Sequence, residues 1–143
     1  APKSDSGPGS GLNQVVAEEL QPAKLLSNLE YNIELNELRG RCEIERLDWH
    51  ACLLPDFQSA KYEVVIGSDV IYYEEDAEAL AAAVLQHTQP GASFLLMNRR
   101  ERPGLSSVLE RLREKGDIEE QEMMLVSNVG STPLLFAHFR RSS

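Results

Sequence analysis

The sequence predicts an α/β fold: a mostly parallel, Rossmann-like sheet with crossover helices and an antiparallel hairpin at its C-terminal end. From Leu12 onward, apolar runs of strand length alternate with stretches of helical periodicity. The last two strand-like runs are separated by a turn sequence rather than a helix, so we expect them to pair antiparallel. The length of 143 residues suits a single hydrophobic core.

The first part of the chain alternates strand, helix and strand. Residues 12–17 contain an apolar run and predict a buried strand. Apolar residues at helical spacing predict a helix over 22–38, which Gly40 is placed to end. Residues 41–47 alternate and predict a second strand, whereas 50–60 predict a connecting loop or short helical turn.

The second part continues the alternation and contains the strongest strand signal, the β-branched run at 62–69. Three acidic residues at 74–76 favour a helix N-terminus, because negative charge complements the backbone dipole there. The elements expected after them are a helix ending at Pro90-Gly91, a strand at 92–97, a helix at 105–115, a strand at 118–126, a turn at 130–133 and a strand at 134–139.

Composition and charge exclude several classes of function. Hydrophobic residues are 42% and charged residues 26% of the chain, which is typical of a soluble globular protein. The formal net charge of -9 disfavours a role that coats nucleic acid, and fits basic or neutral partners better. No apolar run is long enough to cross a bilayer, so we expect no membrane association and a cytoplasmic location, the nucleus being the other option.

The N-terminal segment and the cysteines indicate the domain organisation and the redox chemistry of the chain. Residues 1–11 are rich in Pro, Gly and Ser and predict a flexible linker or loop, which leaves 12–143 as one domain. The two cysteines, Cys42 and Cys52, are too few for a disulfide scaffold or a thiolate zinc site, and we expect reduced thiols.

Acidic residues follow three of the predicted strands. Glu18 and Glu19 follow the first, Asp48 the second and Asp69 the third. Ligands of open parallel sheets bind outside the carboxyl ends of the strands, and a carboxylate there can accept hydrogen bonds from both ribose hydroxyls. The alternative is that these acids only cap the helices that follow.

Two aromatic residues accompany these acids. Trp49 offers a stacking surface for an adenine-like ring, although a single Trp is also a common core residue. Asp69 and Tyr72 are three residues apart, so a turn after the strand would point both into one pocket. The alternative is an ordinary turn with tyrosines packed beneath it.

Other chemistry finds little support. The three histidines are scattered singly, so we predict no metal site, and no nucleophile elbow or phosphate-binding glycine loop is present. Arg99, Arg100 and Arg102 form the one local basic cluster. Such a cluster is usually a solvated rim, or it contacts an acidic patch on a protein substrate.

Taken together, these segments resemble the seven-β-strand, S-adenosylmethionine-dependent methyltransferases. Within them the chain is similar to the protein-lysine group that includes methyltransferase-like 21, marked by an acid-x-x-Tyr or Phe motif after the fourth strand. The matching segments are Val15-Val16-Ala17-Glu18-Glu19-Leu20, Leu26 to Asn36, Leu47-Asp48-Trp49 and Val65-Ile66-Gly67-Ser68-Asp69-Val70-Ile71-Tyr72.

The resemblance implies a function and roles for individual residues. It implies a methyltransferase that uses S-adenosylmethionine to modify lysine side chains of a protein substrate. Glu19, with Glu18 as a competitor, matches the acid that holds the cofactor's ribose, and Asp48 and Trp49 match the residues beside the adenine. Asp69 and Tyr72 match the acid-x-x-aromatic motif near the methionine part of the cofactor and the entering substrate.

The sequence also departs from the family. The family's first strand and glycine-rich loop should precede Leu12, where only the Pro/Gly/Ser-rich segment stands. We therefore expect a C-terminal part of the domain with exposed strand edges, completed by an N-terminal segment or by a partner chain. Two other functions stay open: a non-catalytic, methyltransferase-like partner subunit, and an enzyme that methylates a small molecule.

Overall fold

The computed structural model describes residues 22–143, which form two compact units, one ending at Leu47 and the other spanning Asp48–Ser143. The predicted strand at 12–17, the linker at 1–11 and Glu18 and Glu19 lie outside the described residues. No helix among residues 22–143 is long and apolar enough to span a membrane.

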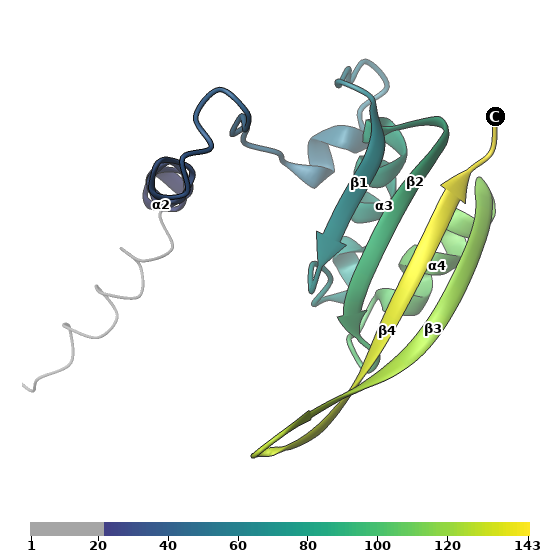
Figure 1. Cartoon of the computed structure of the whole chain (residues 1–143). Coiled ribbons are helices and arrows are strands. Elements are labelled where there is room, and N and C mark those ends of the chain that lie inside the picture. Colours follow the sequence, from purple (N-terminus) through teal and green to yellow (C-terminus); the bar gives the residue numbers. More distant parts are fainter. Residues whose placement is uncertain (1–21) are drawn as a thin grey trace, which may run out of the picture. The chain divides into compact units, whose positions relative to one another are not determined.

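The first unit contains the helix α2, Pro22–Leu35 (Figure 1). The helix ends earlier than predicted, and Gly40 does not end it. Glu37 adopts the left-handed conformation with φ 56°, its N–H donates to the carbonyl of Glu34 at 3.1 Å, and the N–H of Leu38 donates to that of Ile33 at 2.9 Å. This pair of hydrogen bonds is a Schellman motif, which satisfies carbonyls that the helix leaves free at its end.

The strand predicted at 41–47 is wrong. The segment makes only an isolated bridge, between Arg39 and Cys42, and otherwise has no regular structure. Alternating apolar residues form a strand only when a neighbouring strand accepts their backbone hydrogen bonds. Among the described residues no strand lies beside this segment, so the alternation alone does not produce one.

The second unit is a four-stranded sheet with helices on one face (Figure 1). Its elements in chain order are the 3-10 helix η1 (Trp49–Leu53), β1 (Tyr62–Ser68), the 3-10 helix η2 (Glu74–Asp76), α3 (Ala77–His87), β2 (Thr88–Arg99), α4 (Leu105–Arg113), β3 (Gly116–Ser127) and β4 (Gly130–Arg141). The spatial order of the strands is β1-β2-β4-β3, so the predicted α/β class is confirmed.

The direction in which two strands pair depends on the segment that connects them. β1 and β2 are parallel and are joined through α3, whereas β4 runs antiparallel to both β2 and β3. The predicted C-terminal hairpin is thus confirmed, but its turn is not at 130–133. The pairing continues to Ser127 and Gly130, which leaves Asn128 and Val129 as the two turn residues.

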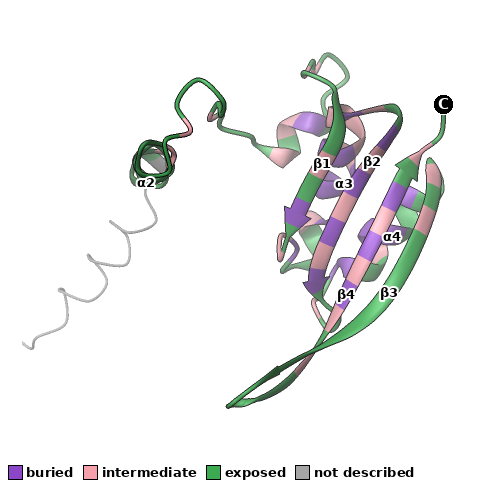
Figure 2. Ribbon diagram, viewed as in Figure 1, coloured by how far each residue is buried: buried purple, intermediate pink, exposed green. Residues whose placement is uncertain are grey.

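The core lies between the sheet and the helices α3 and α4, as the buried residues in Figure 2 show. Alternate residues of β2 face it, because successive side chains of a strand point to opposite faces. On α4, four buried residues recur at helical spacing. The buried residues of β2 are Thr88, Ala92, Phe94, Leu96 and Asn98, and those of α4 are Leu105, Val108, Leu109 and Leu112.

The opposite face of the sheet carries exposed apolar side chains. On β1, Val64 is 54% and Ile66 is 74% exposed, whereas Val65 between them packs against the core. β1 is also an edge strand, paired only with β2 among the described residues. Within residues 22–143, β1 therefore has one edge without a neighbouring strand, and the exposure of that edge in the whole protein stays a prediction.

Candidate functional site

The predicted pair Asp69 and Tyr72 comes together at the carboxyl end of β1. Asp69 directly follows the strand, and its N–H donates to the carbonyl of Met97 on β2 at 2.7 Å. Its backbone is left-handed, with φ 48°, which turns the chain sharply out of the sheet. The hydroxyl of Tyr72 then donates to Oδ2 of Asp69 at 3.3 Å.

A third residue, Arg102, joins this pair from the loop between β2 and α4. Its Nε donates to Oδ1 of Asp69 at 3.3 Å and its Nη2 donates to Oδ2 at 3.1 Å. Its guanidinium also lies over the ring of Tyr72, with Cζ 4.3 Å from the ring centroid. A planar guanidinium can make a bidentate ion pair and a cation–π contact at once, which a lysine cannot.

The ion pair sets the charge of the site. The hydrogen bonds from Arg102 hold the pKa of the Asp69 carboxyl below its usual range, and the hydroxyl of Tyr72 and the charge of Arg99 act in the same direction. Burial acts in the opposite direction and raises this pKa, but only in part, because the Asp69 side chain is still 38% exposed. Asp69 is therefore a carboxylate at neutral pH.

The loop after Asp69 is held by its neighbours, and this fixes where Tyr72 lies. Ile71 is fully buried in the core, and the side chain of Asn98 makes long hydrogen bonds of 3.5 Å to both its N–H and its carbonyl. Gly104 approaches the carbonyl of Tyr73 so closely that a Cβ would stand 2.7 Å from it. With Ile71 anchored, Tyr72 stays 44% exposed beside Asp69.

The other predicted site residues lie on a different element. Asp48 is the N-cap of η1, where its Oδ1 accepts a hydrogen bond from the N–H of His50 at 3.0 Å. Trp49 is half-buried and packs against the hydrophobic core beside α3. These are the capping and core roles that the sequence left open, and a role for either residue beside an adenine stays a prediction. Glu19 lies outside the described residues.

The residues of the site that lie outside the segment 69–72 were not predicted from the sequence. Arg102 stood out only as one of three arginines, and of those Arg100 pairs instead with Glu122, at 3.1 Å. Asn98 gave a weak signal as a polar residue at the end of an apolar run. Nothing in the sequence pointed to the close approach of Gly104.

Metal and thiol chemistry find no site in residues 22–143. No group of three His, Cys, Asp or Glu side chains in this part of the chain could hold a metal ion. Both cysteines are free; Cys42 is exposed and Cys52 is buried. Burial raises the pKa of the Cys52 thiol, and the charge of Asp48 raises it further, so this side chain is a poor nucleophile.

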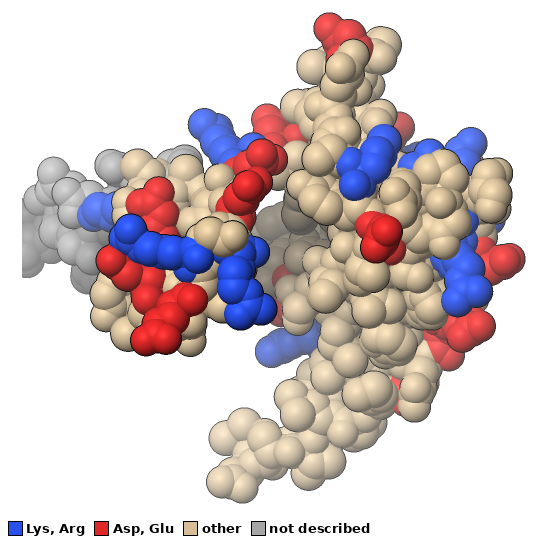
Figure 3. Space-filling model, turned by 45° about the horizontal axis from the view of Figure 1, so that its top comes forward, with Lys and Arg blue, Asp and Glu red and all other residues tan. Residues whose placement is uncertain are grey.

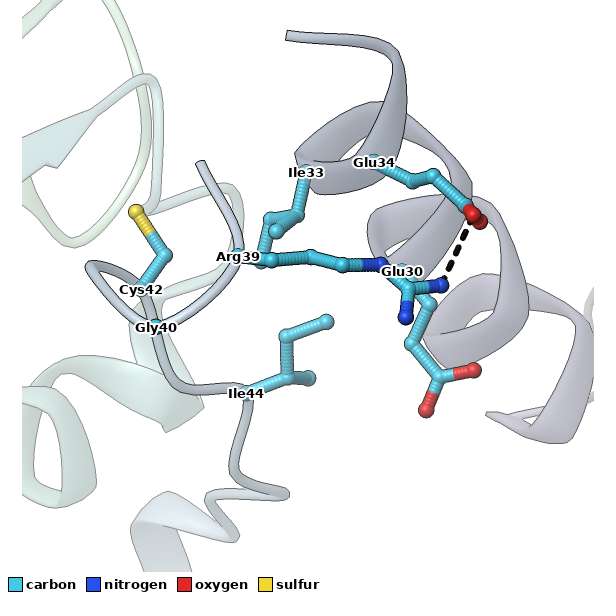
Figure 4. Close-up of a pocket in the computed structure, with 7 residues that line it drawn as sticks. All are labelled: Glu30, Ile33, Glu34, Arg39, Gly40, Cys42 and Ile44. Atoms are coloured by element: carbon cyan, nitrogen blue, oxygen red, sulfur yellow. Dashed lines mark ion pairs between the residues drawn. The ribbon is translucent and has the colours of Figure 1, made fainter. Parts of the chain in front are cut away.

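The first unit contains a hollow of its own. Figure 4 shows it between the end of α2 and the turn that follows, with a volume of about 410 Å³. Arg39 reaches across it to Glu34, with Nη2 2.8 Å from Oε1, and both side chains are more than half exposed. An exposed ion pair of this kind contributes little to binding or stability.

Comparison with known proteins decides the family. The family model described as lysine methyltransferase matches residues 13–115, which is most of the chain. The chain belongs to this lysine methyltransferase family. None of the curated proteins matches the chain significantly.

One of the matching solved structures is a protein of low sequence identity. The O-methyltransferase TomG from Streptomyces achromogenes, involved in tomaymycin synthesis and solved in complex with SAM, matches with 15% identity and a TM-score of 0.37. The match covers 66% of this chain and 45% of TomG. The chain therefore spans less than half the length of this neighbour.

The described residues do not by themselves fit a complete site for S-adenosylmethionine. One oxygen of Asp48 is engaged in capping, Trp49 packs on the core, and the Asp69 carboxylate is held by Arg102 and Tyr72. What residues 22–143 do offer is a polar cluster at the carboxyl end of β1, formed by Asp69, Tyr72 and Arg102. We call these three residues the Asp69 cluster.

Proposed function

We propose that this chain is part of an enzyme that methylates the side-chain amine of a lysine in a protein substrate, with S-adenosylmethionine as methyl donor. The observation that carries the proposal is the joining of Asp69 and Tyr72, the two ends of the predicted motif, in one hydrogen-bonded cluster where β1 ends. Membership of the lysine methyltransferase family supports the choice of lysine.

The Asp69 cluster suits the amine side of the reaction. A lysine amine has an ordinary pKa of about 10.4, so it must lose a proton before it can attack a methyl group. Asp69 is a weak proton acceptor, because its pKa is lowered by Arg102. We therefore assign Asp69 and Tyr72 to orienting the amine, and solvent to receiving its proton. Orientation alone can supply a large part of the rate.

The charge of the chain supports a protein substrate. A formal net charge of -9 attracts the basic segments in which lysines are common, and it repels nucleic acid. The unpaired edge of β1 and the apolar face beside it support a further proposal: an N-terminal segment or a partner chain completes the sheet there.

The test is a methyl-transfer assay with the complete protein, S-adenosylmethionine carrying a labelled methyl group, and a protein extract. We expect label in the protein fraction, released as methyllysine on acid hydrolysis. Label confined to small molecules would instead identify a small-molecule methyltransferase. No label in either fraction would contradict the proposal and favour the non-catalytic partner subunit.

A further inference from the structure

The structure contains a residue that the predicted motif does not include, yet that touches both members of the motif. Arg102 comes from the loop between β2 and α4, more than thirty positions after Asp69. Its side chain is 26% exposed, which is less than the 38% of Asp69, so the pair is partly shielded from solvent. Partial shielding strengthens an ion pair relative to one on an open surface.

The hydrogen bonds of the cluster leave the hydroxyl oxygen of Tyr72 free to accept a hydrogen bond. An ionised carboxylate has about four acceptor positions, and three contacts fall on Asp69: Nε and Nη2 of Arg102 and the hydroxyl of Tyr72. Since Tyr72 donates its only hydroxyl proton to Asp69, the lone pairs of its oxygen stay available. A substrate amine can donate an N–H to that oxygen.

The stacking of Arg102 adds a second constraint. With its guanidinium 4.3 Å from the ring centroid of Tyr72, Arg102 fixes the plane of the phenol as well as the carboxylate that receives the phenol's proton. The loop itself is fixed, because Arg102 lies between the end of β2 at Arg99 and the tight turn at Gly104, where φ is 85°.

We propose that Arg102 is a positioning residue of the methyltransferase: it holds the Asp69 carboxylate so that the Tyr72 hydroxyl points its proton inward and its lone pairs toward the substrate amine. The inference rests on the proposed function and deepens it. Each residue then has its own role: Arg102 fixes the position of the Asp69 carboxylate, Asp69 fixes the direction of the Tyr72 hydroxyl, and the oxygen of Tyr72 contacts the amine.

The first arm of the test is spectroscopic and needs neither cofactor nor substrate. In the complete protein, the carboxyl carbon of Asp69 is followed by NMR as the pH is lowered. The charged and titratable groups that face Asp69 are Arg102, Tyr72 and Arg99. We expect Arg102→Gln to raise the pKa of Asp69 toward its ordinary value of about 3.9, and Arg102→Lys to raise it less.

The matched control is Arg100→Gln. Arg100 belongs to the same loop, but it pairs with Glu122 and makes no hydrogen bond to Asp69 among the described contacts. We expect this variant to leave the pKa of Asp69 unchanged. An unchanged pKa in Arg102→Gln would overturn the proposal, provided that its thermal midpoint shows that the variant is folded. If Arg102→Gln does not fold, Arg102→Lys decides in the same way.

The second arm measures methyl transfer in the same variants across pH. Because the folded-state pKa of Asp69 is depressed in the wild type, its carboxylate persists to low pH and is lost only as the pH falls through that value. We expect Arg102→Gln to lower the rate at neutral pH about tenfold and to lose activity at a higher pH than the wild type. Arg102→Lys should recover part of both effects, and Arg100→Gln should match the wild type.

The two arms separate this inference from the proposed function. Suppose that the wild-type protein transfers no methyl group but Arg102→Gln still shifts the pKa of Asp69. The proposed function is then wrong, whereas the interaction between Arg102 and the Asp69 carboxylate is confirmed. If the wild type is active and all variants show its rate and pH profile, the positioning role fails and the proposed function stands.

Discussion

At the scale of the residue, the geometry of the site depends on how the loop after β1 is fixed. Asp69 and Tyr72 were predictable as a pair because both belong to one short segment after a strand. Arg102 was not, since the residue that approaches a carboxylate from a distant loop is decided by the fold and leaves no local pattern. Among the three arginines of that region, only the structure distinguishes Arg102 from Arg100.

Gly104 supports this loop and gives a test of its packing. We expect Gly104→Ala to lower the free energy of unfolding by about 2 kcal/mol or more, because φ is 85° and the added Cβ would stand 2.7 Å from the carbonyl of Tyr73. Urea denaturation measures the change.

Gly91 is the matched control for that substitution. Its φ of 79° is similar, but a Cβ there would meet nothing nearer than 4.0 Å. Gly91→Ala should therefore cost only the backbone strain of about 1 kcal/mol. Equal losses in the two variants would show that the contact of Gly104 with the loop is not tight.

At the scale of the element, prediction succeeded where a strand has a neighbour to pair with. β1, β2, β3 and β4 overlap the strands predicted at 62–69, 92–97, 118–126 and 134–139, although β2 begins already at Thr88, where the preceding helix was expected to continue to Pro90-Gly91. The segment 41–47 has the same alternation and no partner, so it forms no strand. Turn positions were less predictable, since hairpin pairing continued to Gly130 through residues expected to turn.

The end of α2 shows why a helix stop is difficult to place. The sequence offered Gly40, but the left-handed position is taken by Glu37, at φ 56°. A non-glycine residue pays about 1 kcal/mol in that conformation. We expect Glu37→Gly to relieve this strain and raise the helix content measured by circular dichroism. Glu34→Gly, inside the helix, should lower it; a loss of helix in both variants would contradict the Schellman motif.

The hairpin of β3 and β4 has a tip that is exposed to solvent. It has no charged residue from Met123 to Ala137, and in Figure 3 it projects from the molecule as an uncharged surface. Met124 is 59%, Val126 is 73% and Val129 is 97% exposed. Exposed apolar ribbons of this kind favour association between chains.

At the scale of the whole molecule, the described helices of the second unit cover one face of its sheet. Helices α3 and α4 pack on one side, and apolar residues of β1 remain exposed on the other. Most α/β sheets are buried on both faces. Among the described residues, β1 also has one edge without a neighbouring strand.

Adjacent residues of β1 test this asymmetry. In the 143-residue chain, Ile66→Lys should change the free energy of unfolding by less than about 0.5 kcal/mol, because the side chain is 74% exposed. Val65→Lys should cost about 3 kcal/mol, because it puts a charge against the core. Chemical denaturation compares them, and similar losses would mean that the face of Ile66 is covered.

The most direct test of the central claim is the rate of methyllysine formation by the complete enzyme with Asp69→Asn, measured beside Asp117→Asn, an exposed acid on β3. Asn tolerates the left-handed backbone and keeps the side-chain shape, so only the charge is removed. We predict a fall of about a hundredfold for Asp69→Asn and none for Asp117→Asn. Wild-type rates in both variants would contradict the account.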